Sequence, residues 1–123
     1  MTRLLEYAVV KDPKAESRER RWKVRTLGYR YHVMLSDLTE VALWHWHPSG
    51  KSSYKDPHFH VGVAQLEAGA VVRRAKHNPS GRIAFEQVLL QLLAEYGVKP
   101  ARDDWETCLN ATLDRFATWR TWH

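Results

Sequence analysis

Two short segments of this chain place an aromatic residue between two histidines, at residues 45–47 (His-Trp-His) and 58–60 (His-Phe-His). Imidazole titrates near neutral pH, so it can accept or donate a proton there, and its neutral form is the commonest protein ligand of transition metals. The ten residues between the segments, 48–57, begin and end with proline and are rich in Gly and Ser at their centre. We therefore expect two strands joined by a loop, with the histidines as the chemically active residues.

Strand periodicity puts the four histidines on one face of a sheet. Alternate side chains of a strand share a face, so residues 45–47 and 58–60 present four imidazoles together if they pair in register as a hairpin. The other face then carries large apolar side chains, which are Trp44, Trp46, Phe59, Val61 and Val63. A slip of one residue would bury the polar rings and expose the apolar ones. We therefore predict the register in which the histidines converge.

One interpretation of this cluster is metal-independent cleavage of RNA. One histidine would take the proton from a ribose 2′-hydroxyl and another would protonate the leaving 5′-oxygen. The candidate catalytic residues are His58 and His60, followed by His45 and His47. Cationic and aromatic side chains would bind the phosphate and the unpaired bases, and the candidates include Arg30, Tyr31, Lys51 and Lys55. On this interpretation the protein is an endoribonuclease-like enzyme that needs no cofactor.

Two other interpretations remain open for the same cluster. The protein could be a non-catalytic metal- or ligand-binding module in which His45, His47, His58 and His60 hold zinc or another transition metal. Asp56 is the only acidic residue close to them in sequence, so an obvious carboxylate partner is missing. Alternatively, the histidines are simply the polar face of a half-exposed sheet and have no chemical role.

Composition and charge limit the remaining possibilities. The chain has 123 residues, 44% of them hydrophobic, which suits a single domain over residues 1–123. Residues 1–82 carry fifteen basic and eight acidic side chains, whereas residues 83–123 carry four and six. This asymmetry is compatible with binding a polyanion such as RNA. No apolar run reaches the roughly 20 residues of a membrane span, so we expect no membrane partner. The lone cysteine cannot form an internal disulfide, and we expect a cytoplasmic protein.

The histidines must be positioned by the surrounding elements, which the sequence divides into strands followed by helices. Short runs rich in β-branched and aromatic residues predict strands at 4–10, 21–25, 29–36, 40–47 and 58–65, with a weaker sixth at 71–77. A period of 3.6 residues then predicts two helices. They are expected at 82–96, capped by Ser80, and at 103–122, starting with a capping box between Asp103 and Glu106. The predicted fold is α+β, an antiparallel sheet of five or six strands with two C-terminal helices packed on one face.

Three motifs in residues 29–96 resemble the TumE-type toxins of bacterial toxin–antitoxin modules. They are Tyr29-Arg30-Tyr31-His32, His47-Pro48 and Pro57-His58-Phe59-His60-Val61. The positions that match the family pattern are Arg30, Tyr31, His32, His58 and His60, and we expect His32 beside the other substrate-binding residues. The resemblance implies a growth-inhibiting, RNA-directed protein that a cognate antitoxin neutralises. The sequence departs from the family at residues 45–47 and in the final helix.

Overall fold

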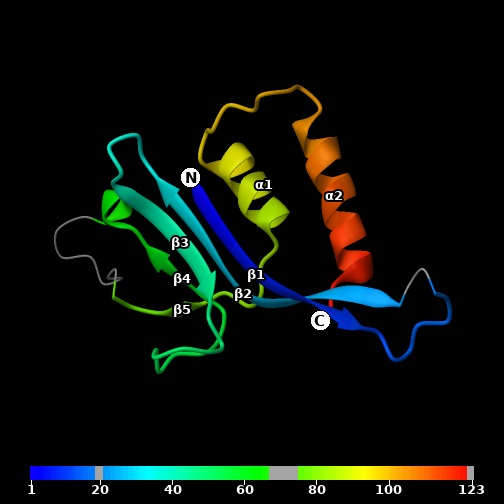
Figure 1. The fold of residues 1–123 in the computed structure, drawn as a ribbon. Coiled ribbons are helices and arrows are strands. Elements are labelled where there is room, and N and C mark those ends of the chain that lie inside the picture. Colours follow the sequence, from blue (N-terminus) through cyan, green and yellow to red (C-terminus); the bar gives the residue numbers. More distant parts are fainter. Residues whose placement is uncertain (19–20, 67–74, 122–123) are drawn as a thin grey trace. The chain divides into compact units, whose positions relative to one another are not determined.

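The computed structural model describes residues 1–18, 21–66 and 75–121. It contains one antiparallel five-stranded sheet and two helices, so the predicted α+β class is confirmed (Figure 1). The chain divides into two compact units, residues 1–7 with 26–83 and residues 8–25 with 84–123. The histidine segments both belong to the first unit.

The five strands follow one another in the sheet in the same order as in the sequence. Antiparallel strands that follow one another in the sequence can be joined without a crossover, and the resulting arrangement is a β-meander. The strands are β1 (Thr2–Lys11), β2 (Trp22–Met34), β3 (Glu40–Trp46), β4 (His58–Val61) and β5 (Asn78–Pro79). The long loop expected at 48–57 lies between β3 and β4, and the strands on either side of it carry the histidines.

The prediction of separate strands at 21–25 and 29–36 is wrong, because β2 runs through both. Gly28 lies within this strand. A Cβ atom on Gly28 would lie 2.9 Å from the carbonyl oxygen of Trp46 on β3, so glycine is needed here for close approach between strands. A turn at residues 36–37 follows β2, and the Asp37 carboxylate accepts the Thr39 N–H at 2.9 Å.

The fifth predicted strand, 58–65, is shorter than expected. It ends at Val61, and a 3₁₀ turn follows at Val63–Gln65 (η1). Gly62 donates its N–H to the Val41 carbonyl at 2.9 Å, and a Cβ atom there would overlap the backbone of Glu40. The strand therefore ends where the chain passes β3 too closely for a side chain, and Val63 is 50% exposed rather than in the core. Most of the sixth predicted strand lies outside the described residues, and β5 forms just after it.

The buried face of the sheet is built from aromatic residues at alternate positions. Tyr29, Tyr31, Trp44 and Trp46 are each at most 8% exposed. The rings of Tyr29 and Tyr31 stack at 4.8 Å, and the Tyr29 hydroxyl accepts the Ile83 N–H at 3.2 Å. Burial raises the pKa of Tyr29. Because these residues occupy one face, the intervening residues of β2 and β3 must point to the other.

The helices of the second unit, α1 (Phe85–Glu95) and α2 (Trp105–Trp119), contact each other and are shorter than predicted. Ser80 does not cap α1. The residue before the helix is Ala84, and the Gln87 side chain accepts its N–H at 2.8 Å. Asp104, not Asp103, precedes α2, and its carboxylate pairs with the Arg102 guanidinium. Neither predicted capping residue therefore occupies the N-cap position of its helix.

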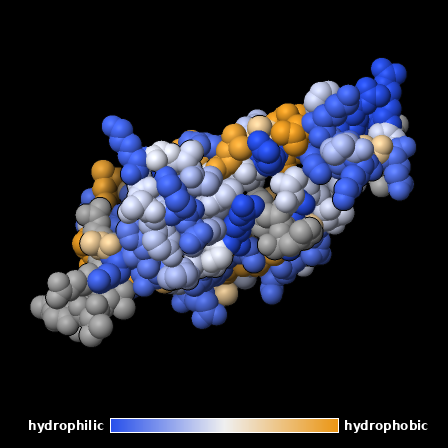
Figure 2. All heavy atoms as spheres, turned by 90° about the horizontal axis from the view of Figure 1, so that it is seen from below, coloured by the Kyte–Doolittle hydropathy of each residue, from blue (hydrophilic) through white to orange (hydrophobic). Residues whose placement is uncertain are grey.

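Hydrophilic side chains predominate on the face seen in Figure 2, and hydrophobic ones occupy smaller patches. Such a surface is expected for a chain with a net charge of +5 and 27% charged residues. Among the described residues, neither α1 nor α2 has the length and apolar character of a membrane-spanning helix.

Candidate metal centre

Pairing of β3 with β4 brings the two histidine segments together. His45 lies opposite His58, and Leu43 lies opposite His60. The predicted register is therefore confirmed, and it places His45, His47, His58 and His60 on one face. Trp44 lies opposite Phe59 on the other face. The period of two along each strand is sufficient to explain this separation of polar from apolar rings.

The four imidazole rings converge at short range. The centroid of the His45 ring lies 4.0 Å from that of His58, 4.7 Å from that of His47 and 4.9 Å from that of His60. The Nε2 atoms of His45 and His60 are 2.9 Å apart and share one proton in a hydrogen bond. A cation placed between these two nitrogens would replace that proton.

A fifth histidine and a tyrosine enclose the cluster. The His77 ring centroid lies 4.7 Å from that of His58 and 4.9 Å from that of His60. Tyr54, from the loop between β3 and β4, stacks on His77 at 4.8 Å with the ring planes 17° apart. The sequence did not fix the position of His77. The pairing of β5 with β4 at Asn78 brings it to the cluster.

Three of these residues have the spacing of metal ligands. One ring nitrogen from each of His45, His58 and His60 lies within 4.8 Å of the other two. A tetrahedral zinc ion with Zn–N bonds of about 2.1 Å holds its ligands about 3.4 Å apart, which is within the upper limit of 4.8 Å found here. No carboxylate or thiolate belongs to this group among the described residues.

His58 is oriented like a metal ligand. Its side chain is fully buried, and its Nδ1 lies 2.6 Å from the carbonyl oxygen of Asp56, to which the Nδ1–H donates. This bond leaves the lone pair on Nε2, which is buried and has no hydrogen-bond partner among the described residues. In metal sites a backbone carbonyl commonly fixes the tautomer of a histidine ligand in this way. Asp56 therefore contributes through its backbone rather than its carboxylate.

The electrostatic environment keeps two of the histidines neutral. Burial, with the neighbouring rings of His58, His47 and His60 and the Arg30 guanidinium, lowers the pKa of His45 to about 3. Burial also lowers the pKa of His58, opposed by its hydrogen bond to Asp56. Both side chains are therefore neutral at pH 7, which is the form that binds a metal.

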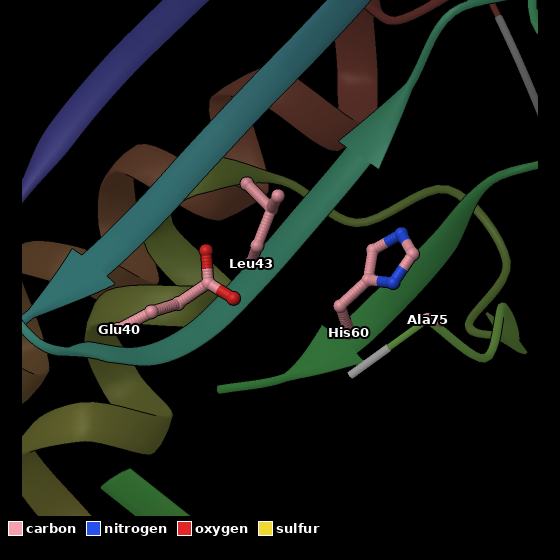
Figure 3. A pocket seen from close by; sticks show the side chains of 4 residues that line it. All are labelled: Glu40, Leu43, His60 and Ala75. Atoms are coloured by element: carbon pink, nitrogen blue, oxygen red, sulfur yellow. The ribbon is translucent and has the colours of Figure 1, made fainter. Parts of the chain in front are cut away.

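A carboxylate that sequence analysis missed lies beside the cluster. Glu40 is 7% exposed, and its Oε2 lies 2.7 Å from Nε2 of His32. Glu40 and His60 line the same pocket, of about 410 Å³, together with Leu43 and Ala75 (Figure 3). The pairing of β2 with β3 shifts register between Val33 and Met34, and strand alternation alone could not place Glu40 across such an irregularity.

The predicted substrate-binding residues are distributed over several sites. Arg30 lies opposite His45 on β2, and His32 lies opposite Leu43, so both share the face of the cluster. Tyr31 is buried on the opposite face and is not brought to the cluster. Lys51 and Lys55 are exposed in the loop between β3 and β4, where the Lys55 ammonium donates to the Gly50 carbonyl at 2.9 Å.

Comparisons with known proteins add no relative. No family model, no curated protein and no solved structure matches this chain. The resemblance to TumE-type toxins stays a prediction. The functional argument therefore depends on the geometry of the histidine cluster.

Proposed function

We propose that this protein binds a transition-metal ion, with zinc favoured, through His45, His58 and His60. The observation that carries the proposal is the convergence of one ring nitrogen from each of these three histidines. It is supported by the buried Nε2 of His58, which has no hydrogen-bond partner among the described residues. Imidazole is a preferred ligand of zinc, and three histidines are a known ligand set for it. Zinc, copper and nickel all accept imidazole, so the choice of zinc is part of the test.

A purely structural role explains the cluster less well. A buried polar atom without a hydrogen bond costs about 1–3 kcal/mol of stability. Polar histidines on a half-exposed sheet would be expected to face water, but His58 is fully buried and its Nε2 is directed away from its one hydrogen bond. A bound cation would give that nitrogen a partner and would offset the cost.

Three protein ligands leave room for a fourth group at a tetrahedral ion. Structural zinc sites normally use four protein ligands, whereas catalytic sites keep one position for water or substrate. His47 and His77 lie next to the three proposed ligands, but they do not belong to the group whose nitrogens lie within 4.8 Å of one another. We therefore infer an open coordination position.

The proposal is tested by metal analysis of tag-free protein. After loading with one equivalent of zinc and desalting, wild-type protein should retain close to one ion per chain. His58→Leu should retain none, whereas His32→Gln, a histidine change on the same face but outside the ligand set, should retain the wild-type amount. A wild-type protein that loses its zinc on desalting, or a His58→Leu variant that keeps it, would overturn the proposal.

The second candidate is metal-free cleavage of RNA by the same histidines. Two observations favour it, the 2.9 Å separation of the His45 and His60 nitrogens and the position of Arg30 opposite His45. Burial lowers the pKa of His45 and of His58, which counts against these two as proton donors. Cleavage of a mixed RNA pool that persists in a strong chelator and is lost in His60→Ala would establish this candidate. The proposed toxin role, with RNA as target and an antitoxin as partner, depends on the same assay.

A further inference from the structure

We propose that the metal-loaded site hydrolyses phosphodiesters, with Glu40 as the general base and Arg30 as a phosphate-binding residue. The proposal rests on the metal site inferred above and assigns it a reaction and a substrate class. It differs from metal-free RNA cleavage because a water molecule, and not a ribose hydroxyl, attacks phosphorus.

The position of Glu40 suits a base. Its carboxylate is buried, and Nε2 of His32 lies 2.7 Å from one carboxylate oxygen. Figure 3 shows the Glu40 side chain, from the start of β3, and the His60 ring, from β4, at the same pocket. With a volume of about 410 Å³, the pocket has room for water and for part of a substrate between the carboxylate and the ligand histidine. A base must reach the attacking water directly or through one further water.

Arg30 lies on the other side of the ligand set. On the cluster face, Arg30 of β2, His45 of β3 and His58 of β4 are cross-strand neighbours. The next cross-strand pair on this face is Leu43 with His60. Arg30, His45 and His47 line a second, smaller pocket of about 150 Å³, whose lining also includes the Glu6 carboxylate. A divalent cation at the three histidines, together with the Arg30 guanidinium, would face the single negative charge of a phosphodiester.

The substrate class follows from these charges. A phosphodiester needs positive groups at its non-bridging oxygens and a base near the water that attacks in line with the leaving oxygen. Arg30 and the metal ion with its open position supply the positive groups, and Glu40 supplies the base. A carboxylic ester would need the metal and the base but not the guanidinium, so dependence on Arg30 separates the two classes.

The chemical step balances without a further reactant. Water at the open position gives a proton to the Glu40 carboxylate, and its oxygen forms a new bond to phosphorus. The bond between phosphorus and the leaving oxygen breaks, and the proton held by Glu40 passes to that oxygen. The products are a phosphomonoester and an alcohol, and Glu40 returns to its ionised form.

The experiment uses the zinc-loaded protein with bis(p-nitrophenyl) phosphate, and p-nitrophenyl acetate as the ester control. We expect metal-dependent release of p-nitrophenol from the diester. Glu40→Gln should lower kcat by about 100-fold, a typical effect of losing a general base, while retaining the bound metal. Arg30→Gln should raise KM for the diester by about 10-fold and leave that for the acetate unchanged, as expected for loss of a charge-assisted bond. Glu16→Gln, in the second unit, is the matched control and should behave as wild type.

His32→Gln provides a second test if Glu40→Gln does not fold. His32 is a positioning residue for the carboxylate, so this variant should lower kcat on the diester while metal content and KM stay near wild type. Full activity of either folded variant would refute the role of Glu40. Metal-loaded protein that does not cleave the diester, or that cleaves only the acetate, would refute the substrate class. Protein that holds no metal would refute the proposed function itself, and metal analysis detects that failure separately.

Discussion

Replacing His58 by leucine should change stability in opposite directions in the metal-free and the metal-loaded protein. Leucine has a volume close to that of histidine and carries no polar atom, so it removes the buried, unpartnered Nε2. That removal should contribute about 1–3 kcal/mol. The substitution also removes the Nδ1 bond to the Asp56 carbonyl, worth about 1 kcal/mol. Because Asp56 is exposed, water can replace this donor. We therefore expect metal-free His58→Leu to be more stable than wild type by about 0–2 kcal/mol.

Zinc should reverse this order. A ligand that binds only the folded protein stabilises it by about 2.7 kcal/mol when its free concentration is one hundred times its dissociation constant. Wild type should gain this stability, and His58→Leu should gain none. Urea unfolding followed by tryptophan fluorescence, with a chelator and with buffered zinc, measures both states.

The control for this prediction is His32→Leu, which removes a histidine whose buried Nε2 makes no hydrogen bond among the described residues but lies 2.7 Å from a carboxylate oxygen of Glu40. Glu40 then loses its contact with His32, so metal-free His32→Leu should be less stable than wild type by about 1–3 kcal/mol. A His58→Leu variant that is destabilised by more than about 2 kcal/mol without metal would show that Nε2 is satisfied in the folded protein. Equal stabilisation of wild type and His58→Leu by zinc would refute the ligand assignment.

Three further predictions concern pH and backbone geometry. Because the pKa of His45 is about 3 in the folded protein and near 6.5 in the unfolded chain, the unfolded chain binds more protons below pH 6.5. The free energy of unfolding should therefore fall from pH 7 to pH 5, and His45 should account for roughly 1 kcal/mol of this fall after allowance for its partial exposure. In His45→Asn the urea midpoint should depend less on pH over this range. Burial raises the pKa of Tyr29, so the unfolded chain loses that proton first above about pH 10. Stability should fall there in wild type and less in Tyr29→Phe, and equal slopes of the two proteins in alkaline urea titrations would refute this assignment. Gly62→Ala would place a Cβ atom against the Glu40 backbone and should lower the unfolding free energy by about 2 kcal/mol or more, whereas Gly50→Ala meets no neighbouring atom and should cost only about 1 kcal/mol for its φ of +97°.

The sequence predicted the histidine face because a strand repeats every two residues and because the two faces differ strongly in polarity. Trp44 and Trp46 are buried and Phe59 lies on their face, which leaves the histidines of both strands together on the other. The same reasoning could not separate ligands from neighbours. His45, His58 and His60 form the closest group, whereas His47, which shares their pattern, stands outside it.

The features that sequence reasoning missed depend on contacts between distant segments. The role of Asp56 is a backbone hydrogen bond to His58, for which its carboxylate gives no signal. Glu40 is brought to the cluster face beyond a register shift, and His77 is positioned by a two-residue strand. The predicted break between strands 21–25 and 29–36 does not occur, because close packing against the Trp46 backbone requires glycine at position 28 inside β2.

The most direct test of the metal site is zinc K-edge X-ray absorption on tag-free protein loaded with one equivalent of zinc. The proposed site predicts three imidazole nitrogens at about 2.0 Å and one oxygen ligand in the fourth position, with the imidazole signal absent from His58→Leu. A spectrum of hydrated zinc with only oxygen neighbours, or one that is the same in wild type and His58→Leu, would contradict the assignment of His45, His58 and His60 as a metal centre.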